Sequence, residues 1–211
     1  MLTDLLRGLG TSLEIFFFTL LIALPLGFPL ALGRMSKNRL LSGVIGVWIS
    51  VVRGTPLMLQ IIFVYFAPYF MFGMPLASYP RLLATVIAFG LNYGAYFAEI
   101  YRGGILSVDP GQREAAKALG LSRAQTFFRI ILPQTVKRVI PAVGNEVITL
   151  VKDTSLAFTI AVTEMFTIAK QLSSANTTMT PLIAAAVFYY IFNYLVAFVM
   201  GRLEKRYAYY A

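Results

Sequence analysis

Long uninterrupted stretches of apolar residues dominate the chain and predict helices that cross a membrane. A helix needs roughly 20 consecutive residues to span the hydrocarbon core of a bilayer. Four apolar runs have about that length, at residues 11–33, 82–101, 141–163 and 181–201. The first run competes with a signal peptide, but it is longer and lacks a small-residue exit of the Ala-x-Ala type, so a retained span is favoured.

A fifth apolar run, residues 40–76, is too long for one straight helix. Arg-Gly-Thr-Pro at 53–56 interrupts it, and Pro56 disfavours the helical conformation at the residue before it. We therefore expect a short helix at about 41–52 and then a span that ends near Tyr69. The sequence predicts an all-α membrane protein with five spans.

The distribution of basic residues supports this layout. Membrane proteins concentrate Lys and Arg in their cytoplasmic segments. If segments 34–39, 102–140 and 202–211 are cytoplasmic, they hold 13 of the 18 basic residues: Arg34, Lys37, Arg39, Arg102, Arg113, Lys117, Arg123, Arg129, Lys137, Arg138, Arg202, Lys205 and Arg206. This arrangement predicts an N-terminus outside the membrane and a C-terminus in the cytoplasm.

Composition narrows the class of protein. Of the 211 residues 58% are hydrophobic and only 13% are charged, which excludes a soluble enzyme, a disordered chain and a nucleic-acid-binding domain. The net charge of +9 is explained by basic residues on one side of a membrane. The chain contains neither cysteine nor histidine, which removes thiol chemistry, the commonest general base and the usual metal ligands. No repeat or linker divides it, so residues 1–211 are expected to form one membrane domain.

The loop 102–140 predicts two short helices that protrude into the cytoplasm. Residues 114–119 are good helix formers, and Gly120 is a plausible C-terminal stop. Ser122 is a candidate N-cap for a second helix, expected to end before Pro133. The small alanine side chains of the first helix would let it lie closely in a groove of another protein. The alternative interpretation is a solvated loop without a partner.

This loop carries a known signature: Glu114-Ala115-Ala116, then Gly120, Ile130 and Leu132-Pro133. Three further blocks accompany it: RGTPLMLQ at 53–60, YFAEIYRGGI at 96–105 and GNEVITLVKDTSL at 144–156. Together they resemble the permease subunits of type I ABC importers, in the polar amino acid subfamily. The resemblance covers nearly the whole chain.

The resemblance implies a set of partners and a place in the cell. In that family two permease subunits pair in a bacterial inner membrane, as a homodimer or a heterodimer, and an extracytoplasmic binding protein delivers the amino acid. Each permease inserts a coupling helix into a cytoplasmic ATP-binding subunit, a role that falls here on Glu114, Ala115, Ala116 and Gly120. The chain itself has no phosphate-binding loop motif, so ATP-Mg and its hydrolysis are expected on the partner, with no catalytic residue, metal or other cofactor here.

Ionisable residues inside spans are costly and mark candidate functional sites. Glu146, Asp153 and Glu164 are spaced so that, on one continuous helix, they and Thr149 share a stripe. Such a stripe suits a cationic ligand or an α-ammonium group, and internal pairing is the alternative. A helix break at Asp153-Thr154-Ser155 is also open, because these side chains satisfy backbone groups locally.

A second candidate face lies on the span at 82–101. Asn92, Tyr96 and Glu99 are spaced i, i+4, i+7 and could bind the polar ends of an amino acid or hydrogen-bond neighbouring helices. Glu99 also has Arg102 one turn away as a partner. Arg53 could receive a substrate carboxylate, and its alternative role is a salt bridge or an interfacial anchor.

The sequence therefore favours the permease of an importer for a polar or cationic amino acid, with arginine, lysine or histidine ahead of glutamine. The second hypothesis is an ion-coupled secondary transporter or a channel, which would not need the alanine-rich cytoplasmic helix. An intramembrane protease is poorly supported, because histidine is absent and only Asp153 among the aspartates lies well inside a span.

Overall fold

The computed structural model describes residues 1–76 and 80–208, and within these ranges all regular secondary structure is helical. The elements in chain order are α1 Leu2–Arg34, α2 Arg39–Gly54, α3 Leu57–Phe72, α4 Arg81–Leu106, α5 Pro110–Ala118, α6 Arg123–Thr126, the π-helix η2 Phe127–Ile131, α7 Leu132–Asp153, the 3-10 helix η3 Thr154–Ile160, α8 Met165–Asn176 and α9 Thr180–Ala208. The all-α fold is confirmed. The predicted tail and domain extend to residue 211, so their last residues, 209–211, lie outside the described part.

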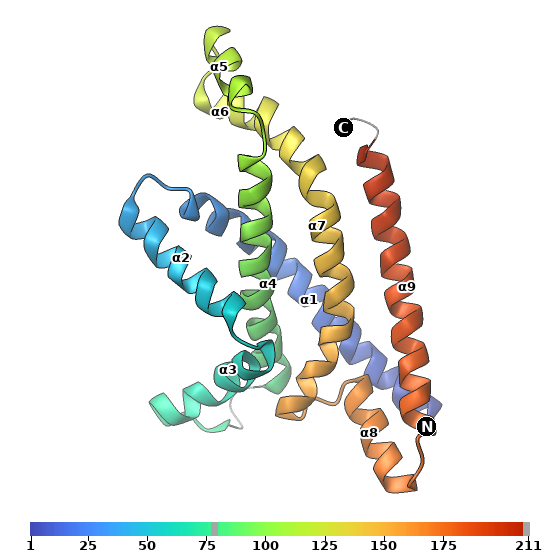
Figure 1. Cartoon of the computed structure of the whole chain (residues 1–211). Helices are drawn as coiled ribbons and strands as arrows, with labels where there is room; N and C mark the ends of the chain where they lie inside the picture. The colour runs from blue at the N-terminus through green and yellow to red at the C-terminus, as the bar shows by residue number, and fades with distance from the viewer. Residues whose placement is uncertain (77–79, 209–211) are drawn as a thin grey trace.

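Helix α4 is the centre of the molecule, and α1 crosses it along most of its length (Figure 1). Small residues allow the two helices to approach closely. A Cβ atom added to Gly27 of α1 would lie 2.7 Å from the Cβ of Phe97 of α4. Without a strong hydrophobic drive in lipid, such close packing is a main source of helix association. Helices α2, α3 and α7 pack against the remaining sides of α4.

Three of the described helices, α1, α4 and α9, are long and apolar enough to cross a membrane. The pair α2 and α3 is bent by 111° and makes a fourth candidate if it counts as one span. The predicted interruption at residues 53–56 is thereby confirmed. Helix α1 begins at Leu2 rather than near residue 11, because Asp4 and Arg7 in its first turns do not interrupt the helix.

The predicted span at 141–163 is not one helix. Helix α7 ends at Asp153, η3 tightens into 3-10 geometry, and Ala161 adopts a left-handed conformation with φ of 56°. The hydroxyl groups of Thr154 and Ser155 donate to the carbonyls three residues earlier, each at 2.8 Å. These side chains compete with the α-helical pattern, which explains the break.

The two short helices predicted for the loop 102–140 form largely as expected, with one correction. Helix α5 ends just before Gly120, whose φ of 73° supplies the turn, and Ser122 caps α6 in a capping box with Gln125. The prediction that the second helix ends before Pro133 is wrong. The N–H of Leu132 bonds to the carbonyl of Phe127 in a π turn, and Pro133 falls in the first turn of α7, where its missing N–H is tolerated.

The two ends of the described chain lie at opposite ends of the molecule (Figure 1). Helix α1 starts at the end that carries α8 and α3. Helix α9 runs towards the end from which α5 and α6 protrude.

Candidate functional site

A group of polar side chains gathers where the α2–α3 bend meets α4 and α7. Hereafter called the hinge cluster, it comprises Arg53, Gln60, Asn92, Tyr93, Tyr96 and Asp153. Four elements supply these residues, because α4 packs against α2, α3 and α7 at once.

Two contacts join the bend to α4. The side-chain amide of Asn92 donates to Oε1 of Gln60 at 3.0 Å. The guanidinium of Arg53 lies 4.9 Å from the ring centroid of Tyr96, a cation–π contact. Arg53 is exposed and Asn92 is buried, so the arginine head can still meet a ligand while the asparagine amide is already engaged.

Asp153 closes the cluster from the side of α7. The hydroxyl of Tyr93 donates to Oδ2 of Asp153 at 2.7 Å. Among the described residues this is the one hydrogen bond that the half-buried Asp153 carboxylate accepts. A carboxylate has about four acceptor positions, so most of its capacity is left for another donor.

Glu164 is in a different environment, although its spacing placed it on the same stripe. Its carboxylate is fully buried and accepts from the backbone N–H of Phe166 at 2.7 Å, from N–H and hydroxyl of Thr167 at 2.6 and 2.8 Å, and from the hydroxyl of Tyr189 at 2.9 Å. It is the N-cap of α8. This geometry supports the internal-pairing alternative for Glu164.

The other predicted residues also differ in whether they are exposed and in whether a partner within the chain engages them. Thr149 is exposed on α7, and its hydroxyl donates to the carbonyl of Asn145 at 3.0 Å. Glu146 is half-buried on the same helix. The predicted pairing of Glu99 with Arg102 is confirmed, with Nη2 and Oε2 2.6 Å apart. The structure thus brings Arg53, Asn92, Tyr96 and Asp153 together and leaves Glu164 apart.

The predicted coupling residues lie at the protruding end of the molecule (Figure 1). Glu114, Ala115 and Gly120 are exposed, whereas Ala116 is buried. Helix α5 therefore exposes only one of the two alanines of the signature, Ala115, and its surface of small residues is narrower than predicted. Arg113, Lys117 and Arg123 line a cavity of about 590 Å³ between α5 and the following helices.

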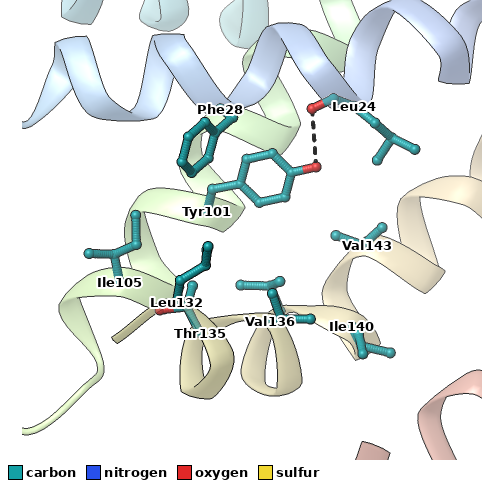
Figure 2. A pocket seen from close by; sticks show the side chains of 10 residues that line it. Leu24, Phe28, Tyr101, Ile105, Leu132, Thr135, Val136, Ile140 and Val143 are labelled. Atoms are coloured by element: carbon teal, nitrogen blue, oxygen red, sulfur yellow. Dashed lines mark hydrogen bonds between the residues drawn. The ribbon is translucent and has the colours of Figure 1, made fainter. Parts of the chain in front are cut away.

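A cavity of about 310 Å³ lies between α1, α4 and α7, and Figure 2 shows its apolar lining. Two polar side chains are among its described lining residues, and both are engaged. Tyr101 donates to the carbonyl of Leu24 at 3.3 Å, and Thr135 donates to the carbonyl of Ile131 at 2.9 Å. This cavity offers no charged partner to an amino acid, so the hinge cluster is the better candidate site.

Sequence reasoning did not single out Gln60 or Tyr93. Gln60 had a usable signal, because it lies four residues after Pro56, where a freed carbonyl needs a donor. Tyr93 had none, since its partner Asp153 is 60 residues away in the chain.

Comparisons with known proteins identify a family and several related permeases. Residues 23–209 match the family described as binding-protein-dependent transport system inner membrane component. The L-cystine transport system permease protein TcyB of Bacillus subtilis (strain 168) is 39% identical over 201 residues, covering 94% of this chain and 84% of TcyB. The glutamine transport system permease protein GlnP of Escherichia coli (strain K12) is 38% identical over 192 residues, covering 89% of this chain and 83% of GlnP.

Solved structures extend the likeness to three dimensions. A crystal structure of an amino acid ABC transporter with histidines superposes with a TM-score of 0.88 at 33% identity, covering 97% of this chain and 94% of that one. The MetNI methionine ABC transporter superposes with a TM-score of 0.79 at 20% identity, covering 98% and 97%, which shows the shared fold. The relatives are permease subunits, and ATP hydrolysis belongs to a separate ATPase subunit. The chain belongs to the family of binding-protein-dependent transport system inner membrane components and is the permease component of an amino acid ABC importer.

Proposed function

We propose that this permease carries a polar or cationic amino acid, with arginine, lysine and histidine favoured, through a pathway lined by the hinge cluster. The observation that carries the proposal is that two tyrosines of α4 contact opposite charges from two other helices, Arg53 of α2 and Asp153 of α7. Tyr93 holds the Asp153 carboxylate and Tyr96 holds the Arg53 guanidinium, and the two tyrosines are three residues apart on α4. A free amino acid has a cationic and an anionic end that match this pair.

Each proposed contact follows from the state of the side chain. Asp153 retains acceptor capacity for an ammonium or guanidinium group, and Thr149 is exposed on the same helix. Arg53 is exposed and can receive the α-carboxylate, with Tyr96 beneath it. Asn92 and Glu164 are kept out of direct contact in this proposal, because hydrogen bonds within the chain already engage them.

The relatives support the class of substrate without selecting one member. Their names include permeases for L-cystine, glutamine and, at 35% identity in Bacillus subtilis (strain 168), arginine. The acidic residues Glu146 and Asp153 on α7 favour a cation over a neutral amide, since an extra positive charge gains from each of them.

The proposed assembly contains a second permease, identical or different, an ATP-binding subunit that holds ATP-Mg, and an extracytoplasmic binding protein. Of the predicted coupling residues, the exposed Glu114, Ala115 and Gly120 form the contact with the ATPase, supported by their place at the protruding end, and the buried Ala116 lies behind them. We place this end in the cytoplasm and the start of α1 outside, because the basic segments flank the protruding helices.

The test of the assembly is affinity purification of the tagged chain from its native membrane in mild detergent. We expect an ATP-binding subunit in about equal amount, and the presence or absence of another permease decides between heterodimer and homodimer. Reproducible recovery of the folded chain alone would contradict the proposal and favour an ion-coupled secondary transporter or a channel.

A substitution at Gly120 tests the coupling contact. A valine there must adopt φ near 73°, which costs a β-branched residue about 1–2 kcal/mol and distorts the turn after α5. We expect Gly120→Val to insert in the membrane but to lose ATPase attachment or substrate-stimulated hydrolysis. The exposed Gly103 of α4 has ordinary helical geometry, so Gly103→Val serves as the matched control. Normal coupled transport by Gly120→Val would count against the assigned contact.

A further inference from the structure

The bend between α2 and α3 leaves a backbone group that the helices cannot satisfy. In a continuous helix the carbonyl of Val52 accepts from the N–H of residue 56, which is a proline and has none. Thr55 is extended, with φ of −117° and ψ of 146°, so the helical pattern stops here. A backbone carbonyl without a donor is costly wherever it is kept from water, as in the hydrocarbon core of a bilayer.

The side chain of Gln60 takes over this task from the far side of the bend. Its amide nitrogen lies 2.7 Å from the carbonyl oxygen of Val52, 3.1 Å from the carbonyl oxygen of Thr55 and 2.9 Å from Oγ1 of Thr55. Oγ1 of Thr55 in turn donates to the carbonyl of Val51 at 2.9 Å. One residue of α3 therefore ties the end of α2 to the start of α3.

Helix α4 also contacts Gln60, from outside the α2–α3 bend. The buried amide of Asn92 donates to the remaining oxygen of Gln60 at 3.0 Å. One helical turn further on, Tyr96 lies beneath the guanidinium of Arg53. Asn92 and Tyr96, four residues apart on α4, thus contact both sides of the bend. Asn92 contacts Gln60 of α3, and Tyr96 contacts Arg53 at the end of α2.

We propose that Gln60 and Asn92 are positioning residues that lock the α2–α3 bend to α4 and so fix the Arg53 guanidinium where the substrate carboxylate binds. The lock acts through Arg53 and makes no contact with the substrate. This inference rests on the proposed function, because Arg53 needs an anionic group to receive.

The first measurement follows the bend without any transport. The chain has no cysteine, so the pair Val47→Cys and Leu91→Cys, both exposed, can carry spin labels on α2 and α4. We expect a narrow distance distribution in the parent protein, in the complex with its partners, and a clearly broader one after Gln60→Leu or Asn92→Leu. Gln134→Leu is the matched control, because within residues 1–76 and 80–208 that amide donates to the carbonyl of Ile130 alone, four residues earlier in the chain.

The second measurement uses the complete complex in proteoliposomes and amino acid uptake. We expect Gln60→Leu to raise KM about tenfold, the size of effect produced by losing one or two hydrogen bonds. In an Arg53→Met background the same change should raise KM by less than about twofold, because the positioned group is gone. A merely structural role would give the same factor in both backgrounds.

The outcomes separate the lock from the function. An unchanged distance distribution, or an equal change of KM with and without Arg53, overturns the lock. Failure of the parent complex to move any amino acid overturns the proposed function, and the spin-label distances still decide whether the bend is locked. If Gln60→Leu does not fold, Gln60→Asn should broaden the distribution, and Gln60→Asn with Asn92→Gln should narrow it again by restoring the combined reach.

Discussion

Asp153 lies at the break in the predicted span 141–163 and Glu164 directly follows that span, and the surroundings of these two carboxylates differ sharply. Asp153 accepts one hydrogen bond, from Tyr93, and is half-buried. Glu164 is fully buried and accepts four, two of them from the backbone of α8. A carboxylate whose oxygens are all engaged holds structure together, whereas one with spare acceptor positions can bind a donor that arrives. This difference can be tested residue by residue.

The largest expected effect is on folding. Glu164→Ala leaves four donor groups without their carboxylate partner and removes the cap of α8, which should lower the free energy of unfolding by about 3–5 kcal/mol. We expect a strongly reduced yield of monodisperse protein and a much lower Tm in detergent. Glu14→Ala, an exposed carboxylate on α1, is the matched control and should be near neutral. Unchanged stability of Glu164→Ala would contradict the structural role of Glu164.

The next effect is on uptake and not on folding. Asp153→Asn keeps an oxygen for the Tyr93 hydroxyl but removes the charge, so Tm should change little. We expect KM for arginine, lysine or histidine to rise about thirtyfold, equivalent to about 2 kcal/mol of lost charge-assisted binding. Glu204→Gln, exposed near the end of α9, controls for net charge. Unchanged uptake of every cationic amino acid by Asp153→Asn would sink the proposed contact.

A smaller effect distinguishes the donors of Glu164. Tyr189→Phe removes one of its four hydrogen bonds and should lower the free energy of unfolding by about 1–1.5 kcal/mol, with no change in KM. The neighbouring Tyr190 is exposed, and Tyr190→Phe should leave Tm unchanged. A shift of KM in Tyr189→Phe would mean that Glu164 also takes part in transport.

The smallest effect concerns the single donor of Asp153. Tyr93→Phe frees that carboxylate to change its orientation, and we expect KM to rise about threefold while Tm falls only slightly. Tyr194→Phe on the exposed face of α9 is the matched control. A larger loss of stability than in Tyr189→Phe would reverse the ranking of the two carboxylates.

Local chemistry made parts of the fold predictable. Pro56 signalled the α2–α3 interruption, Gly120 the turn after α5, and Ser122 the cap of α6, because each acts on its own neighbours in the chain. The continuation of the helix through Pro133 was not predictable in the same way. It depends on a π turn, and no residue type in that stretch requires one.

The sequence predicted several residues of the candidate site from their residue type, but it did not predict which side chains they contact. Asp153, Arg53 and Tyr96 were expected from the cost of polar groups in a membrane. Their partners were hidden, because Tyr93 and Asp153 are 60 residues apart in the chain and Asn92 and Gln60 are 32 apart. The spacing placed Glu164 on one stripe with Asp153, which required a continuous helix through both residues. Helix α7 ends at Asp153, so Glu164 lies in different surroundings.

The π turn at Phe127–Ile131 joins α6 to α7, so the chain is helical without interruption from Arg123 to Asp153. At about 1.5 Å per residue this segment is roughly 45 Å long. A rigid tilt of the whole segment by about 10° about its α6 end, where we propose the ATPase contact, would displace the Asp153 end by about 8 Å, more than the length of a side chain. In the proposed mechanism the ATPase contact lies beside one end of this helix and the Asp153 carboxylate lies at the other, so an ATP-driven movement would reach the hinge cluster through the helix backbone, without a relay of side chains.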